Sequence, residues 1–202
     1  MRVVPAICSF VLLGTAACGG SDASDTAGIS AATTVAERSD GDTSGGPAAL
    51  GVEVSVPMEE LARNHVDGTV NYDRYPPLGG DHNARWQECG FYTVPVPSER
   101  AVHSMEHGSI WIAYSPDVDQ AQVEVLAILA EGQTHVLITP QEGLPAPVVA
   151  TAWGFQIELS DADDPALETF IDAHIFDGPE PGAPCSGTGV GVPPEDAGGG
   201  TA

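Results

Sequence analysis

Lysine is absent from this chain of 202 residues, and arginine is rare, at six residues. Against these six positive charges stand 29 aspartate and glutamate residues, so the formal net charge is −23 at pH 7. Proteins that bind nucleic acids need a basic surface to neutralise phosphates, and this chain has too few cations to form one. We therefore expect no nucleic-acid partner, and an anionic membrane surface would also repel the chain.

Long apolar runs are missing as well, because none reaches the roughly 20 residues that a membrane-spanning helix requires. Residues 1–18 nevertheless have the order of a short export signal, with Arg2 before an apolar stretch and small residues after it. Their end, Thr15–Cys18, resembles the cleavage box of bacterial lipoproteins, in which the cysteine becomes the lipid-bearing first residue. That box prefers Leu where Thr15 stands, so plain secretion is the alternative. We expect an exported protein that a lipid on Cys18 anchors to the extracytoplasmic face of the cell membrane.

Composition divides the rest of the chain into three parts. Residues 19–51 consist mostly of small and polar residues without an aromatic, so they cannot bury enough surface to fold and are predicted to form a disordered spacer. Residues 186–202 are predicted to be a disordered Gly-rich tail. All aromatic residues except Phe10 lie between these two segments, which predicts a single globular domain over residues 52–185.

Four cysteines are present, and two of them belong to the N-terminal segment. The other two, Cys89 and Cys185, are predicted to form a disulfide, because an even number of cysteines in an exported domain is typical of such bonds. The bond would close a loop of about 97 residues and stabilise the fold by roughly 4 to 5 kcal/mol on the chain-entropy model. A metal site with two thiolates is the alternative, but neither cysteine has another Cys or a His at zinc-site spacing.

The apolar pattern predicts the fold class from residue 109 onward. Residues 110–114 have no polar position, which predicts a strand covered on both faces. Helices are predicted at 115–132 and from Asp164 onward, with strands between them at 135–140 and 148–159. This order favours an α+β fold, with a small mixed sheet and helices packed on one face. The residues before this region, rich in Pro and Gly, are predicted to form long loops over the sheet.

The histidines of one short motif are the first candidates for chemistry. His103 and His107 are four residues apart in a predicted helix that begins near Ser98 and ends at Gly108. That spacing places both imidazoles on one face, about 6 Å apart, where two ring nitrogens can share one metal ion. With Glu106 between them, the string H-x-x-E-H also matches a zinc metalloprotease motif in which the Glu activates a water molecule.

The metalloprotease interpretation has requirements that the motif alone does not meet, and a structural interpretation of the histidines also remains. A zinc hydrolase needs a third protein ligand and an open coordination position, and it needs a helix that continues past the site, whereas this helix stops at Gly108. The histidines are also consistent with a buried hydrogen-bonded network that braces the loops against Trp111.

A second motif precedes the first and gives the chain a family resemblance. Residues 75–82 read Y-P-P-L-G-G-D-H, and residues 102–110 read V-H-S-M-E-H-G-S-I. These strings are similar to P-P-T-S-G-P-H and V-H-S-L-E-H-G-G-V of the bacterial DUF3105 family, whose function is unknown. The second motif matches closely, whereas the first differs at three positions, and the resemblance covers about residues 60–176.

The resemblance implies an exported or membrane-anchored protein, and it implies no activity. It carries over four residues as site candidates, namely His82, His103, Glu106 and His107.

Convergence of the two motifs would assemble a metal site. His82 follows two glycines that permit unusual backbone angles, so its loop is able to approach the helix that carries His103 and His107. Three imidazoles suit copper or zinc, and Glu106 is then a fourth ligand, a hydrogen-bonding partner of a ligand, or a base. His65, beside Val66 and Asp67, is expected to be exposed and outside this set.

The sequence therefore favours an extracytoplasmic lipoprotein that binds copper or zinc, with a role in metal capture or handover, over an enzyme. One alternative is a metal-dependent hydrolase with Glu106 as its general base. The other is an interaction module with structural histidines, in which loops around Trp86 and Phe91 contact a protein partner at the cell envelope.

Overall fold

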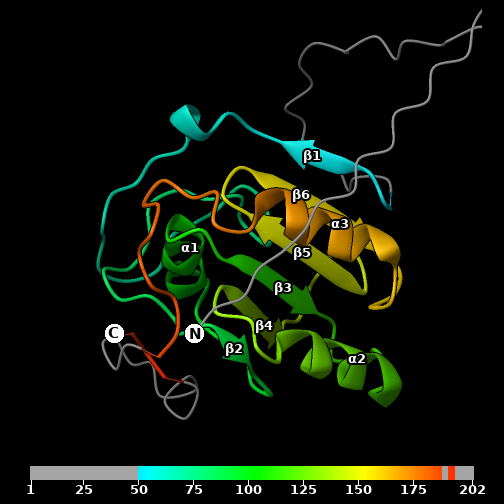
Figure 1. The fold of residues 1–202 in the computed structure, drawn as a ribbon. Helices are drawn as coiled ribbons and strands as arrows, with labels where there is room; N and C mark the ends of the chain where they lie inside the picture. The colour runs from blue at the N-terminus through cyan, green and yellow to red at the C-terminus, as the bar shows by residue number, and fades with distance from the viewer. Residues whose placement is uncertain (1–49, 188–190, 194–202) are drawn as a thin grey trace, which may run out of the picture. The chain divides into compact units, whose positions relative to one another are not determined.

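The computed structural model describes residues 50–187 and 191–193 (Figure 1). The predicted export signal with Cys18, nearly all of the spacer and most of the Gly-rich tail lie outside the described residues. None of the described helices is both long enough and apolar enough to cross a membrane. The elements along the described chain are β1 (Glu53–Ser55), the 3-10 turn η1 (Met58–Glu60), β2 (Gly90–Phe91), α1 (Ser98–Glu106), β3 (Ile110–Tyr114), α2 (Gln120–Ala130), β4 (Val136–Pro140), β5 (Val148–Ala152), β6 (Phe155–Leu159) and α3 (Pro165–His174).

One mixed sheet contains all six of these strands, in the order β1-β6-β5-β3-β4-β2. β4 pairs in parallel with β3, because α2 carries the chain back between these two strands, and it also pairs in parallel with β2. The remaining pairs, β3 with β5, β5 with β6 and β6 with β1, are antiparallel. A mixed sheet with three helices confirms the predicted α+β class.

Side chains of β3 alternate between two buried layers, as the absence of polar positions predicts. Ile110 and Ile112 face a core shared with α2 and α3, whereas Trp111 faces a second core that includes residues of α1. The predicted packing on one face therefore holds for α2 and α3. α1 and the loops before it cover the opposite face, because the apolar side of α1 packs on Trp111 rather than on the first core.

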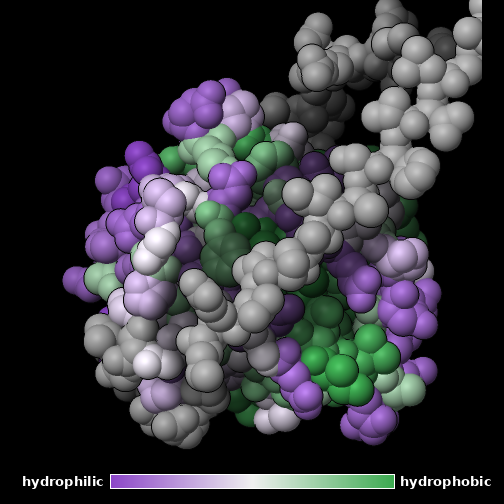
Figure 2. Space-filling view, in the orientation of Figure 1, coloured by the Kyte–Doolittle hydropathy of each residue, from purple (hydrophilic) through white to green (hydrophobic). Residues whose placement is uncertain are grey.

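Capping side chains set where two of the helices begin. Asp119 accepts a hydrogen bond from the backbone N–H of Gln122 at 2.9 Å, so α2 begins after this residue, later than predicted. Asp164 caps α3 in the same way, with Pro165 as the first helical residue, as predicted. α2 buries only Leu126 completely, and Figure 2 shows apolar surface where this helix lies.

The predicted disulfide between Cys89 and Cys185 is present, and it joins residues 96 positions apart. Both cysteines are buried in the core on the α1 side of the sheet. The bond therefore fixes the end of the described C-terminal segment beside the loop that precedes α1. This connection matters for the site below, because Pro184, next to Cys185, contacts a histidine of the motif.

Candidate metal centre

A short parallel bridge between two loops brings His65 and His82 together. The backbone N–H of Val66 donates to the carbonyl of His82 at 2.8 Å, and the N–H of His82 donates to the carbonyl of Asn64 at 3.0 Å. The side chain of Asp81 accepts hydrogen bonds from Asn64, which holds the two loops in this register. The rings of His65 and His82 lie edge to face, with centroids 5.1 Å apart.

The helix α1 supplies the other half of the cluster. His103 and Glu106 lie in its last turn, and His107 is the residue that caps it. The rings of His103 and His107 lie on the same side of the helix, with centroids 4.7 Å apart, as the four-residue spacing predicts. Gly108 ends the helix at φ 87°, a left-handed conformation that favours glycine.

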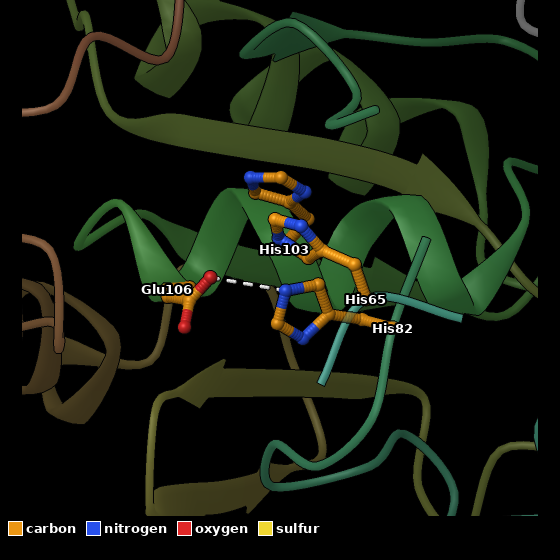
Figure 3. A group of neighbouring side chains, drawn as sticks. All are labelled: His65, His82, His103 and Glu106. Carbon is orange, nitrogen blue, oxygen red and sulfur yellow. Dashed lines mark ion pairs between the residues drawn. The ribbon is translucent and has the colours of Figure 1, made fainter. Parts of the chain in front are cut away.

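Four side chains from these elements converge, and Figure 3 shows His103 and Glu106 on α1 facing His65 and His82 from the loops. One potential ligand atom from each of the four lies within 4.8 Å of those of the other three. His82, His103 and Glu106 are buried, and His65 is exposed. We call these four residues the inner group. Three imidazoles and a carboxylate form a donor set that zinc and copper accept.

Backbone carbonyls fix the orientation of three of the imidazole rings. The Nδ1 atoms of His82, His103 and His107 lie 2.8, 2.7 and 2.8 Å from the carbonyl oxygens of Gly80, Asn83 and Pro184 respectively. A carbonyl oxygen only accepts hydrogen bonds, so each Nδ1 carries the proton. In the neutral ring, Nε2 then holds the lone pair. Histidines that bind metals are held in this way, through a hydrogen bond from the second nitrogen.

The contact between His82 and Glu106 brings together two atoms that both attract positive charge. Nε2 of His82 lies 3.0 Å from a carboxylate oxygen of Glu106, and both atoms are buried. Among the described residues neither atom has a hydrogen-bond partner. A lone pair and a carboxylate oxygen repel each other at this distance unless a proton or a metal ion lies between them. The site therefore requires a positive charge at this point.

The environment of the motif histidines favours their neutral form. The pKa of His103 is lowered from 6.5 to about 4, mainly by burial and to a smaller extent by the three neighbouring histidines, and the hydrogen bond to Asn83 partly opposes this shift. Burial also lowers the pKa of His107, against the opposing effects of Pro184, Glu180 and Glu106. Neutral rings are the form that binds metal, so His103 and His107 are ready to act as ligands at pH 7.

A second group of potential ligands adjoins the first. His103, His107 and Glu180 place one potential ligand atom each within 4.8 Å of one another, and Nε2 of His107 lies 3.6 Å from a carboxylate oxygen of Glu180. We call these three residues the outer group, because the side chain of Glu180 is 53% exposed. Its backbone N–H donates to the carbonyl of Glu106 at 2.9 Å, which places the segment after α3 against the end of α1.

The structure groups the candidate residues differently from the sequence analysis. His82, His103 and Glu106 lie together as expected, but the third imidazole beside them is that of His65, which is exposed and still belongs to the inner group. His107 joins Glu180 in the outer group instead. No local signal in the sequence marks His65 or Glu180, because each reaches the site through a contact between distant segments.

A surface cavity of about 510 Å³ lies elsewhere in the described part of the chain. None of the inner-group or outer-group residues lines it. It lies between the start of α2 and the loop before β5, and its lining consists of Ser115, Asp117, Val118, Asp119, Gln122, Leu144, Pro145, Ala146, Pro147 and Ser160. This cavity therefore does not supply a substrate cleft for Glu106.

The model of a protein family described as "Protein of unknown function (DUF3105)" matches residues 65–187, which is more than half of the chain. The chain belongs to the DUF3105 family. The match begins at His65 of the inner group and includes all the residues of both groups. No curated protein and no solved structure matches the chain. Family membership therefore confirms the predicted resemblance and brings no activity with it.

Proposed function

We propose that this DUF3105 protein binds one copper or zinc ion in the inner group and captures or hands over that ion outside the cell. The observation that carries the proposal is the buried contact between His82 and Glu106, in which two atoms that attract cations lie 3.0 Å apart without a hydrogen-bond partner among the described residues. A metal ion bound by both atoms would remove the repulsion between them.

The donor set supports a transition metal rather than a hard cation. His65, His82 and His103 offer ring nitrogens, and Glu106 offers the only carboxylate of the inner group. Calcium and magnesium prefer sites made almost entirely of oxygen ligands, whereas imidazole-rich sites suit zinc and copper. The hydrogen bonds from Nδ1 to carbonyls also hold the rings of His82 and His103 before an ion arrives, which lowers the ordering cost of binding.

The N-terminal segment and the cysteines support a location for this activity outside the cell. We propose that the chain is exported and that a lipid on Cys18 holds it at the extracytoplasmic face of the membrane. The disulfide between Cys89 and Cys185 supports export, because such bonds persist in oxidising compartments. The spacer of residues 19–51 would span about 30 Å as a random coil and keep the domain clear of the bilayer.

Calorimetric titration of the metal-free full chain with Zn²⁺ and with Cu²⁺ tests the proposal. We expect about one ion per chain, bound at micromolar concentration or below, and a loss of affinity of about 10- to 100-fold in Glu106→Gln. Glu53→Gln is a matched control, because Glu53 also contacts a histidine, His174, at 2.8 Å, but far from the inner group in the fold. Its binding should equal that of the wild type.

Two results would contradict the proposal. The first is the absence of saturable binding of either ion by the wild-type chain, which would assign the buried contact to an imidazolium–carboxylate ion pair. The second is equal affinity in the wild type and in a variant that combines His82→Ala with His103→Ala, provided that both fold, as judged by circular dichroism. Equal affinity would place any bound ion outside the inner group.

A further inference from the structure

His103 belongs to both the inner and the outer group, although it has only one nitrogen to offer. Its Nδ1 donates to the carbonyl of Asn83 at 2.7 Å, so only Nε2 has a lone pair to offer to a metal ion in either group. A single lone pair binds one metal ion at a time. An ion held with His107 and Glu180 and an ion held with His82 and Glu106 therefore compete for His103, and the two groups are alternative positions rather than a two-metal site.

We propose that the outer group is an exchange position, through which a copper or zinc ion reaches and leaves the inner group. This inference rests on the proposed function and adds a second binding position and a route to it. The ion would first bind His107 and Glu180, and His103 would then transfer it to the inner ligands. Release would follow the same path in reverse.

Exposure distinguishes the two positions. The carboxylate side chain of the outer group, Glu180, is 53% exposed, whereas that of the inner group, Glu106, is 5% exposed. Three protein ligands leave the outer position at least one open coordination place, which a ligand of an incoming complex or of an acceptor is able to occupy. Exchange between two carriers needs such a shared intermediate, and the buried side chains of His82 and Glu106 cannot form one with an external molecule.

His65 is the exposed member of the inner group, so its side of the cluster is a second direction from which a metal ion could approach. Its ring stacks on the ring of His103, with centroids 4.9 Å apart and an angle of 21° between the planes. The stacked ring covers His103 on that side. His103 and His107 instead meet edge to face, with centroids 4.7 Å apart, and one end of this pair leads to the exposed carboxylate of Glu180.

Kinetic measurements on the full chain test this route. An exchange position speeds entry and exit equally, because the dissociation constant is the ratio of the two rates. In Glu180→Gln we expect loading by Zn²⁺ and extraction of bound Zn²⁺ by excess EDTA to slow together, each by about tenfold, with an unchanged dissociation constant. Asp177→Asn is the control, because it removes the same charge from the same exposed segment without altering either group.

Any other outcome overturns the inference, and each one points to a different cause. Rates in Glu180→Gln equal to those of the wild type would show that the outer group is not on the path. Slower exchange in His65→Ala but not in Glu180→Gln would assign the path to the opposite side. Loss of equilibrium affinity in Glu180→Gln would make Glu180 a ligand of the resting site. If the wild type binds no ion, the proposed function fails first, before any variant is compared.

Discussion

His103 is the residue on which both groups depend, and its environment explains its role. Its ring is buried among three other imidazoles, all of which disfavour a positive charge on it, and burial is the largest cause of its lowered pKa. The hydrogen bond to Asn83 favours the charged form but does not outweigh burial. The ring therefore stays neutral far below the pKa of an ordinary histidine, which is a requirement for binding metal.

The lowered pKa of His103 predicts a loss of stability in mild acid. Between pH 6.5 and about 4 the unfolded chain binds a proton at this residue and the folded chain does not, so the free energy of unfolding falls as the pH falls. We expect His103 to contribute a loss of about 2 kcal/mol between pH 7 and pH 5 in the metal-free chain.

Chemical denaturation of the wild type and of His103→Gln at the two pH values measures this contribution. The carboxylates titrate in both chains, so their effect cancels in the difference between the two pH-dependent losses. A smaller loss in His103→Gln is the expected result. The same loss in both chains would show that His103 takes up its proton equally well in the folded state.

At the scale of elements, the site depends on how α1 is held at its end. Gly108 lies against the backbone of Phe176, so closely that a Cβ atom on Gly108 would lie 2.8 Å from the Cα of Phe176. The N–H of Phe176 donates to the carbonyl of Gly108 at 2.8 Å. The segment from Phe176 to Cys185 thus passes the end of α1, where it presents Glu180 to His107 and the carbonyl of Pro184 to the same ring.

The disulfide fixes the end of this segment, and its removal has two expected consequences. In a double variant, Cys89→Ser with Cys185→Ser, we expect the free energy of unfolding to fall by roughly 3 to 5 kcal/mol, because the unfolded chain is no longer cross-linked. We also expect slower zinc loading, because Pro184 is next to Cys185 and its carbonyl orients His107.

Urea denaturation and stopped-flow loading measure the two effects separately. When the wild-type chain is denatured without reductant, a thiol titration should detect neither Cys89 nor Cys185. An unchanged denaturation midpoint in the double variant would contradict the first expectation. Wild-type loading in a double variant that is still folded would contradict the second.

For the molecule as a whole, the net charge bears on the proposed lipid attachment. A net charge of −23 favours the approach of metal cations and disfavours contact with anionic lipid. We propose that a covalent lipid on Cys18 holds the chain at the membrane in spite of this repulsion. Two acyl chains give stable attachment, where one would give only marginal binding.

Lipid attachment is tested by labelling cells with a fatty-acid probe. We expect the wild-type chain to carry the label and to fractionate with membranes, and Cys18→Ala to lose the label and leave the membrane fraction. Cys8→Ala is a control that removes a nearby cysteine and leaves both Cys18 and the disulfide in place. Label that persists in Cys18→Ala would assign the lipid to another position, and a wild type without label would favour plain secretion.

The features that could be predicted from the sequence alone depend on residues close to one another in the chain. The helical period places His103 and His107 on one face, Asp164 and Pro165 mark the start of α3, and the pattern of residues 110–114 identifies a strand buried on both faces. The count of cysteines left one pairing in the domain, so the disulfide was also predictable. These inferences succeed because helix and strand geometry fix the relation between residues a few positions apart.

Which potential ligands lie together became apparent only from the folded arrangement of the chain. His65 enters the inner group through backbone hydrogen bonds with a loop 17 residues away, and Glu180 reaches His107 because the chain passes the end of α1 after forming α3. His107, which the sequence predicts in one site with His82 and His103, lies in the outer group instead. The physical reason is that contacts between distant segments depend on the packing of the whole sheet and its loops, which no local period in the sequence encodes.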